Sequence, residues 1–418
     1  MTDLSPALPV NGDRLVARLK ALGQVGALPE GGVCRLALTP EDGAGRDLVV
    51  RWMRDQKLQV TIDPIGNIFA TRKGTQDGPS VMIGSHIDTV ATGGIYDGNL
   101  GVLAGLEVLQ ALDDAGIATV QPVTVAAFTN EEGARFQPDM LGSLVHVGDL
   151  PLQEALDTIS IDGTRLGDDL ADIGYAGTAP LGGIKAAAYL EYHIEQGPVL
   201  EAEGIDIGVV EGVQGISWTE ITLSGRASHA GATPMRLRRD AGLAAARIAH
   251  GVADIAKSIG GDMVGTVGSL RLRPNLVNVV AEMAQMTVDL RHPQEKVLAE
   301  AEARLAALVA RVAEEEHVSF TRRRLARFEP VAFDGELVGR VEKTAKSLGL
   351  STRRMFSGAG HDAQMLARTC PAAMVFVPSI AGLSHNTAEY TAPDDIANGL
   401  AVLGTLALDL AGRANTPA

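Results

Sequence analysis

Cysteine is scarce in this chain. Cys34 and Cys370 are the two cysteines in 418 residues, too few for a disulfide scaffold and typical of a reducing compartment. No apolar run reaches the roughly 18 residues that a membrane-spanning helix needs. The stretch from Met1 to Arg14 contains Asp3, two prolines and no apolar core, so it does not resemble a signal peptide. We therefore expect a soluble cytoplasmic protein.

Positive charge is also in deficit. Lys and Arg number 36 against 51 Asp and Glu, which gives a formal net charge of −15. Nucleic acids and anionic membranes attract clustered cations, so we expect neither as a partner. Aromatic residues make up 4% of the chain, which argues against a stacking platform for bases. A small anionic substrate stays open, provided that its site supplies local cations.

Several common catalytic motifs are missing. The sequence has no Gly-x-Ser-x-Gly nucleophile elbow, no Walker motif and no His-Glu-x-x-His motif. The Gly-rich stretch Gly93–Gly101 lacks the spacing of a dinucleotide-binding loop, and neither cysteine lies in a motif that activates a thiol. These absences give little support to serine, thiol, nucleotide or dinucleotide mechanisms.

What the chain does have is a large apolar content and an alternating pattern. Hydrophobic residues make up 46% of it, enough for a large core, and its length suits two or three domains. Helical and strand patterns alternate in the first third, which predicts an α/β sheet with its functional groups beyond the strand carboxyl ends. Residues 150–180 have weak periodicity and predict a surface helix plus loop. The other elements expected here are helices over Gly12–Leu22, 39–56 and Gly98–Leu112, a hairpin over Leu58–Thr71, and strands over Val81–Gly84, Val123–Phe128 and Ala187–His193.

A different pattern begins near Ile216. It predicts the order β-α-β-β-α-β, which is that of the ferredoxin-like split motif, over Ser217–Leu223, Asp240–Ile259, Met263–Leu272, Asn278–Leu290, Gln294–Glu316 and Val318–Phe328. After about Pro330 the pattern returns to mixed α/β, with Glu336–Leu348, Ala373–Val377 and Asp394–Leu410. We expect a discontinuous α/β catalytic domain over residues 1–213 and 330–418, with a smaller domain inserted at 214–329.

Four segments at expected strand ends offer metal-binding or acid–base groups. His86 follows one strand and Asp97 precedes the next helix; an imidazole with a carboxylate suits zinc, manganese, cobalt or nickel. Asp88 could orient the His86 ring. The neighbouring carboxylates of Glu131 and Glu132 could divide into a metal ligand and a general base. The other two segments are Tyr192–Pro198 and Ser384–Asn386.

Each segment alone also has a plain structural explanation. A polar loop after a strand, a solvated acidic turn and a structural histidine are all common, and for a single segment we would prefer these explanations. The functional hypothesis rests on the set, because four strand ends of one sheet can converge. Three His and two carboxylates are enough for two metal ions, with Asp97 as the bridge.

Six segments, in order along nearly the whole chain, carry a family resemblance: Gly84–Val90, Phe128–Phe136, His193–Glu201, His229–Met235, Ser357–Asp362 and Ser384–Thr391. They resemble the dinuclear-metal amidohydrolases of the aminoacylase and bacterial dipeptidase superfamily. Within that superfamily they are similar to the hydantoinase/carbamoylase branch, which comprises N-carbamoyl-L-amino-acid hydrolases, allantoate amidohydrolases and β-ureidopropionases. The His-x-Glu-Gln-Gly-Pro sequence at His193–Pro198 is specific to that branch.

The resemblance implies a mixed-sheet catalytic domain of metallopeptidase type, an inserted ferredoxin-like lid or dimerisation domain, and a homodimer. It also implies two divalent metal ions per subunit, Zn²⁺ or Mn²⁺ with Co²⁺ or Ni²⁺ as alternatives. Glu131 would be the general base, with Asp88 as a supporting catalytic residue. The substrate would be a small ureido or carbamoyl carboxylate. The metal ligands implied are His86, Asp97, Glu132, His193 and His385.

The resemblance also implies how the substrate is held. His229, Asn278 and Arg291 of the inserted domain would bind its carboxylate, and arginine suits this role because its planar fork binds carboxylates bidentately. An ordinary salt bridge is the alternative for Arg291. His229 would also stabilise the tetrahedral intermediate, reaching across from the partner subunit. The ureido group would contact Gln196 and the backbone of Gly358, Ala359 and Gly360.

Two residues depart from what is common in the family, and most other histidines have no expected role. Ser228 stands where many relatives have Asn, and Asn99 where a small or apolar residue is common, so both positions could tune specificity. His361 is expected just behind the metal ligands. We assign no role to His146, His250, His292 and His317.

Several functions compete. The leading hypothesis is hydrolysis of the carbamoyl C–N bond of an N-carbamoyl-L-amino acid, and the closest alternative is allantoate amidohydrolase. A peptidase or deacylase of the same superfamily is more distant, and the His193–Pro198 segment counts against it. A non-catalytic binding protein on the same fold is the alternative from another class. Loss of Glu131 or of a ligand would indicate it, and the sequence keeps all of them.

Overall fold

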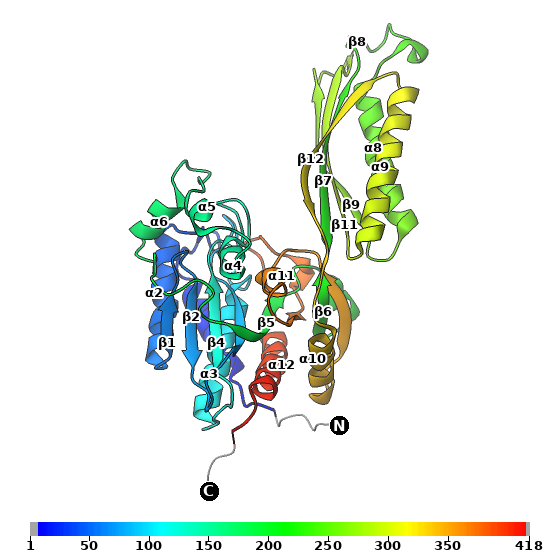
Figure 1. Cartoon of the computed structure of the whole chain (residues 1–418). Coiled ribbons are helices and arrows are strands. Elements are labelled where there is room, and N and C mark those ends of the chain that lie inside the picture. Colours follow the sequence, from blue (N-terminus) through cyan, green and yellow to red (C-terminus); the bar gives the residue numbers. More distant parts are fainter. Residues whose placement is uncertain (1–6, 415–418) are drawn as a thin grey trace. The chain divides into compact units, whose positions relative to one another are not determined.

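The computed structural model describes residues 7–414 and divides the chain into two compact units (Figure 1). The first unit comprises Met1–Gly212 and Ala332–Ala418, and the second comprises Val213–Val331. That the first is catalytic and the second a lid or dimerisation domain stays a prediction. The first six residues, part of the stretch used to argue against a signal peptide, lie outside the described residues.

A nine-stranded mixed sheet forms the centre of the first unit. Its strand order is β1-β2-β4-β3-β5-β15-β6-β13, and β14 pairs with β6. β3, β4, β5 and β15 run parallel to one another at its centre. The strands are β1 (Gln59–Ile62), β2 (Ile68–Arg72), β3 (Ser80–His86), β4 (Val123–Phe128), β5 (Ala186–Ile194), β6 (Ile207–Val213), β13 (Val331–Ala332), β14 (Thr352–Ser357) and β15 (Ala372–Val377).

Helices cover this sheet, so that every residue of β3, β4 and β15 is buried. α3 and α12 pack against β3 and β5, and α4 and α11 also contact the central strands. α3 is apolar around most of its circumference and almost wholly buried, as predicted for a helix inside an α/β fold. The helices are α1 (Gly12–Leu22), α2 (Pro40–Asp55), α3 (Asn99–Asp114), α4 (Leu141–Val147), α5 (Leu152–Leu156), α6 (Leu166–Asp172), α7 (Val199–Glu203), α10 (Gly335–Ser347), α11 (Asp362–Leu366), α12 (Pro393–Ala411) and the 3₁₀ turn η2 (Ile380–Gly382).

Local sequence signals explain how these elements begin. The Thr39 hydroxyl accepts the N–H of Asp42 at 3.3 Å, and Pro40 occupies the first turn of α2, as expected of a helix start. The predicted hairpin is the antiparallel β1–β2 pair. Asp63 holds its turn by accepting the backbone N–H groups of Ile65 and Asn67.

The second unit has the predicted β-α-β-β-α-β order. Its antiparallel sheet has the order β12-β7-β11-β9, and α8 and α9 pack on it over an apolar core that includes Ile221, Met286 and Val309. A separate two-stranded sheet pairs β8 with β10. The elements are β7 (Gly215–Ser224), β8 (Ser228–His229), η1 (Met235–Leu237), α8 (Ala241–Ile259), β9 (Val264–Arg273), β10 (Val279–Val280), β11 (Met283–His292), α9 (Glu295–Glu315) and β12 (Ser319–Phe328).

Two sequence predictions need correction. The single strand expected over Asn278–Leu290 is two strands, β10 and β11, in different sheets. The chain leaves the ladder at Ala281 and Glu282, whose carbonyls accept the N–H groups of Ala241 and Gly225 instead. Residues 150–180 hold two short helices, α5 and α6, rather than one.

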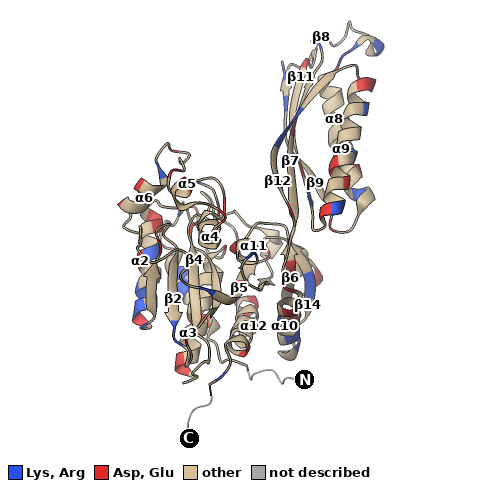
Figure 2. Ribbon diagram, in the orientation of Figure 1, with Lys and Arg blue, Asp and Glu red and all other residues tan. Residues whose placement is uncertain are grey.

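Charged residues of both signs are interspersed over the helices (Figure 2). Two arginines of the arginine-rich strand β12 also have acidic partners: Arg323 pairs with Glu220 at 3.1 Å and Arg327 with Glu302 at 3.0 Å. Among residues 7–414, no helix combines the length and apolarity needed to cross a membrane.

His146 gives the fold a testable pH dependence. The centre of its ring lies 5.2 Å from that of Phe69 and 5.8 Å from that of Phe128, and its buried Nδ1 has no hydrogen-bond partner among residues 7–414. Burial lowers the pKa of His146 to about 4. As pH falls below the ordinary value of 6.5, the unfolded chain binds the proton first, so His146 makes the fold less stable in acid.

We predict that H146F loses less stability in acid than the wild type. A cavity of about 360 Å³ beside His146 leaves room for the larger ring. Between about pH 7 and about pH 5, the wild-type free energy of unfolding should fall by about 1 to 2 kcal/mol more than that of the variant. Urea denaturation at both pH values measures this difference, and parallel losses would contradict the assignment.

Candidate metal centre

The parallel strands bring the four predicted polar segments to one edge of the sheet. His86 ends β3 and lies opposite Phe128, the last residue of β4. His193, near the end of β5, lies opposite Phe376 of β15. The segments that follow β4 and β15 therefore leave the sheet at the level of these two imidazoles. The first carries Glu131 and Glu132, called the acidic turn here, and the second carries His385.

A cavity of about 110 Å³ lies at this edge. Its walls include the five predicted metal ligands, the predicted base Glu131, and the predicted substrate contacts Gln196, Ala359 and Gly360. Asp139 and His361 complete the lining, which consists of His86, Asp97, Glu131, Glu132, Asp139, His193, Gln196, Ala359, Gly360, His361 and His385.

Asp97 joins two groups of side chains through different oxygens. Its Oδ1 lies 3.1 Å from His193 Nε2 and 3.7 Å from His86 Nε2; His86, Asp97 and His193 are called the buried cluster here. Its Oδ2 lies 3.5 Å from His385 Nε2, which lies 3.3 Å from Glu132 Oε2; Asp97, Glu132 and His385 are called the exposed cluster. In each cluster the candidate ligand atoms lie within 4.8 Å of one another.

Hydrogen bonds at Nδ1 of the His86 and His193 rings leave the Nε2 atoms of these rings facing the buried cluster. Nδ1 of His86 lies 2.9 Å from the backbone carbonyl of Asp88, and Nδ1 of His193 lies 2.9 Å from that of Ile194. Each carbonyl favours a proton on Nδ1, which leaves the lone pair on Nε2. The N–H of Gly98 indeed donates to His193 Nε2 at 3.2 Å. This donor set of imidazole nitrogens and carboxylates fits zinc, manganese, cobalt or nickel.

The two clusters differ in exposure. The side chains of His86 and His193 are 1% exposed, whereas that of His385 is 52% exposed. His385 also has a φ of 52°, which is uncommon for a residue other than glycine and needs support from its surroundings. The exposed cluster is therefore the side that a ligand can reach.

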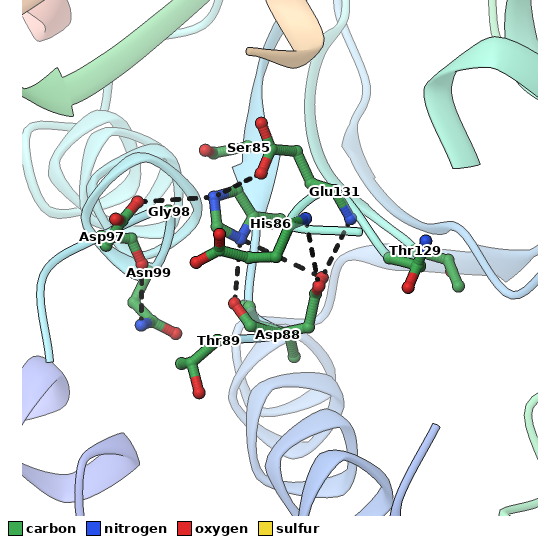
Figure 3. Close-up of polar contacts among 12 residues, drawn as sticks. Ser85, His86, Asp88, Thr89, Asp97, Gly98, Asn99, Thr129 and Glu131 are labelled. Atoms are coloured by element: carbon green, nitrogen blue, oxygen red, sulfur yellow. Dashed lines mark hydrogen bonds and ion pairs between the residues drawn. The ribbon is translucent and has the colours of Figure 1, made fainter. Parts of the chain in front are cut away.

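Asp88 contacts the site through both its backbone and its side chain. The ring of His86 contacts its backbone carbonyl, while the carboxylate lies 4.0 Å from the nearest ring nitrogen. The carboxylate accepts the backbone N–H of Glu131 at 3.3 Å (Figure 3). It also accepts the backbone N–H of Glu132 at 3.4 Å. Asp88 thus holds both the imidazole and the acidic turn in place.

Glu131 stands beside the buried cluster, with Oε2 3.3 Å from His86 Nε2 (Figure 3). Burial raises the pKa of Glu131 well above its usual value; the charge of His86 opposes this shift and that of Asp362 adds to it. A carboxylate with a raised pKa, within reach of the same space as the ligands, suits a role in proton transfer.

Asp97 is held ionised by its neighbours. Burial alone would raise its pKa, but the imidazoles of His193, His385 and His86, when protonated at Nε2, donate to Asp97, outweigh burial and hold the pKa of Asp97 well below its usual value. The hydrogen bonds to Asp97 and Glu132 raise the pKa of His385 to about 10. Metal binding would displace this proton, because imidazole binds metals in its neutral form.

A third group of candidate ligands comprises Glu191, His193 and His361. It shares His193 with the buried cluster, and both oxygens of its Glu191 accept hydrogen bonds. His361 Nε2 lies 2.8 Å from the Ser357 hydroxyl, and burial lowers the pKa of His361 well below its usual value. The donors to Glu191 are the Ser85 hydroxyl, the Tyr189 hydroxyl and the Ala363 N–H.

Three predicted substrate residues lie in the second unit, outside the set that lines this cavity. β8 carries His229, and Asn278 directly precedes β10, the strand paired with β8. On β11, Arg291 forms an ion pair with Asp289 at 2.8 Å, and its guanidinium carbon lies 6.0 Å from the centre of the Trp218 ring. The ordinary salt bridge considered from the sequence is thus present; the roles of all three residues stay predictions.

Sequence reasoning missed Asp139 as a cavity residue. Met140 donates its N–H to the carbonyl of Glu131 at 2.7 Å, so the loop turns back and brings Asp139 beside the acidic turn. Burial raises the pKa of Asp139. No periodic pattern marks such a loop, and the one available signal was a further acidic residue shortly after Glu132.

Imidazoles and carboxylates gathered at the carboxyl edge of a mixed sheet, with a carboxylate base beside them, are typical of a metal-dependent hydrolase. Comparison with known proteins agrees. The chain belongs to peptidase family M20/M25/M40, whose family model matches residues 82–409.

Relatives that align with nearly the full length of this chain show a more specific similarity than the family model does. The chain is 43% identical to an N-carbamoyl-L-amino-acid amidohydrolase of Rhizobium meliloti, covering 96% of this chain and 97% of the relative. It is 41% identical to the Geobacillus stearothermophilus protein described in the same way, covering 94% and 97%. It is 34% identical to the allantoate amidohydrolase of Bacillus subtilis, covering 93% and 95%.

A solved structure gives the same assignment for the fold. A hydantoinase/carbamoylase family amidase from Burkholderia multivorans superposes with a TM-score of 0.95 at 45% identity, covering 97% of this chain and 99% of that one. The mixed α/β architecture expected from the sequence is therefore that of this enzyme family.

Gly98 offers a test of the geometry around His86. Its φ is 64°, and a Cβ there would lie 2.3 Å from atoms of the His86 ring. We predict that G98A displaces the ring and weakens metal binding by about tenfold or more. G116A is the matched control, because Gly116 has a φ of 60° and an added Cβ there has no described residue within 4 Å. Calorimetric titration with Co²⁺ measures both variants, and equal affinities would contradict the prediction.

Proposed function

We propose that this chain hydrolyses the carbamoyl C–N bond of N-carbamoyl-L-amino acids, giving the amino acid, ammonia and carbon dioxide. The observation that carries the proposal is Asp97, whose two oxygens face two ligand clusters while Glu131 stands beside one of them. Relatives at 43% and 41% identity bear the name of this activity. They support the choice of a carbamoyl amino acid as the substrate.

The proposed cofactors are two divalent ions, Zn²⁺ or Mn²⁺, with Co²⁺ or Ni²⁺ as alternatives. His86 and His193 would hold one ion, Glu132 and His385 the other, and Asp97 would bridge them. When bound, such ions lower the pKa of a shared water and polarise the carbonyl under attack. The proposed site residues fit this role because, within each cluster, their candidate ligand atoms lie within 4.8 Å of one another.

Glu131 is the proposed general base. Its carboxylate takes a proton from the attacking water as the carbon–oxygen bond forms, and gives it to the leaving nitrogen as the first carbon–nitrogen bond breaks. The carbamic acid that remains loses carbon dioxide, which breaks the second carbon–nitrogen bond and releases the other amine. Asp88 keeps Glu131 in place through the backbone N–H of that residue. One carboxylate therefore serves both proton transfers.

Substrate recognition is proposed to use both units. Arg291, Asn278 and His229 would bind the substrate carboxylate, with His229 supplied by the partner subunit of a homodimer and also stabilising the tetrahedral intermediate. Gln196 and the backbone of Gly358, Ala359 and Gly360 would contact the ureido group. The scarcity of cysteine and the lack of a membrane-crossing helix in residues 7–414 are consistent with a proposed place in the cytoplasm.

Allantoate amidohydrolase is the second candidate, favoured by the 34% identical relative of that name. A non-catalytic binding role is less well supported, because Glu131 and all five candidate ligands are present together in one cavity. Ammonia release from N-carbamoyl-L-amino acids, allantoate and β-ureidopropionate, measured with and without added Mn²⁺ or Co²⁺, decides among the three. Full activity after exhaustive chelation would exclude the metal-dependent mechanism.

We predict that E131Q binds metal normally but loses activity. Gln cannot accept the proton from water, and acid–base catalysis contributes about 10² to 10⁴ in rate. The measurement is kcat for ammonia release alongside metal content by atomic emission. A loss of kcat smaller than about tenfold would remove Glu131 from this role.

We predict that R291A raises KM for substrates bearing a carboxylate by about tenfold or more, because it removes a charge-assisted bidentate contact. Its matched control is R323A. Arg323 lies on β12 of the same sheet, where it pairs with Glu220, and its loss should leave KM unchanged. A carbamoyl amine without a carboxylate should be insensitive to both variants. Unchanged kinetics in R291A would show that the carboxylate is held elsewhere.

A further inference from the structure

Glu389 is a buried carboxylate, 6% exposed, that neither belongs to a ligand cluster nor lines the cavity. Its Oε1 accepts the backbone N–H groups of Tyr96 and Asp97 at 3.1 and 3.2 Å. Its Oε2 lies 3.2 Å from the hydroxyl of Ser384. One oxygen of Glu389 therefore holds the backbone of the Asp97 turn, and the other lies against Ser384.

The contacts of Glu389 also reach the side chain of Asp97. The Ser384 hydroxyl that faces Glu389 donates to Asp97 Oδ2 at 2.9 Å. The Gln196 amide donates to the same oxygen at 2.9 Å. Oδ2 is the oxygen that faces the exposed cluster, so Glu389 holds the backbone of Asp97 and lies against the hydroxyl that holds its side chain.

Glu389 also fixes the loop that carries His385. Ser384, His385 and Glu389 lie within six residues, and Glu389 donates its own N–H to the carbonyl of Asn386 at 3.0 Å. His385 lies inside this closed loop with a left-handed φ of 52°, a conformation that persists where the surrounding contacts enforce it. Glu389 thus ties the His385 loop to the Asp97 turn, 292 residues away in sequence.

The turn before Asp97 is shaped to admit this carboxylate. A Cβ on Gly94 would lie 2.1 Å from Glu389 Oε1 and 2.4 Å from its carboxyl carbon. Gly94 does not have a positive φ, so an alanine there changes the space available and not the backbone preference. The absence of a side chain at Gly94 is what lets Glu389 reach the N–H groups of Tyr96 and Asp97.

We propose that Glu389 is a positioning residue for the exposed cluster, setting the separation between Asp97 Oδ2 and His385 so that a divalent cation fits between them. The inference rests on the proposed function insofar as that function places a cation there. It does not depend on the substrate, because cation binding is measured without one.

The test is titration of the metal-free protein with Co²⁺, followed by calorimetry and by visible absorption, which reports ligand geometry. E389A removes the carboxylate, and G94A keeps it but blocks its place. Both variants should bind the second ion about tenfold to 100-fold more weakly, as is typical when the support behind a ligand is lost, and the first ion within twofold of wild type. E389Q keeps an acceptor for the two N–H groups and should weaken the second ion less than E389A does.

E107A is the matched control. Glu107 is also fully buried and accepts a backbone N–H, that of Asn11, at 2.9 Å, but it lies outside the clusters. Its loss should lower the melting temperature and leave both Co²⁺ affinities unchanged. This control separates a general loss of stability from a selective loss of the second site.

The proposal would be overturned if E389A and G94A bind the second ion with affinities within twofold of wild type. It would also be overturned if the affinities for both ions fall equally. Uptake of fewer than two ions by the wild type would also overturn it. If E389A fails to fold, G94A and E389Q carry the same comparison. Two Co²⁺ ions bound by a protein that hydrolyses no ureido substrate would contradict the proposed function and leave this inference standing.

Discussion

The candidate site depends on one carboxylate used from both sides. Asp97 directs one oxygen to His86 and His193 and the other toward His385. Three imidazoles hold its pKa low despite complete burial, so it stays charged where an isolated acid would be neutral. A buried charge of this kind is stable only where opposite charges and donors surround it. The fold therefore has to bring all the residues around Asp97 into position together.

The fold meets this demand with parallel strands and close backbone contacts. β3, β4, β5 and β15 end at one edge, which brings segments from distant parts of the sequence to a common level. Gly98 allows the turn between Asp97 and α3 to approach the His86 ring, and Gly94 admits the Glu389 carboxylate. Asp88 ties the first imidazole to the acidic turn. Each of these residues acts through geometry rather than by facing a ligand.

Much of this architecture is visible in the sequence. Apolar runs ending in polar clusters predicted the central strands, and the β-α-β-β-α-β order of the second unit followed from periodicity alone. What the sequence could not predict depended on contacts between distant residues. The break between β10 and β11 arises because the carbonyls of Ala281 and Glu282 accept N–H groups outside the strand ladder. Asp88 was expected to orient His86, but its backbone carbonyl as the contacting group was not visible in the sequence. Glu389 and Asp139 gave no periodic signal, because their placement comes from loop closure.

The central claim is that two cations share Asp97, and anomalous diffraction from Mn²⁺- or Zn²⁺-loaded crystals tests it most directly. The account predicts two peaks about 3.5 to 4 Å apart, one at His86 and His193 and one at Glu132 and His385, with an oxygen of Asp97 at each. A single peak, or a peak among Glu191, His193 and His361, would contradict it.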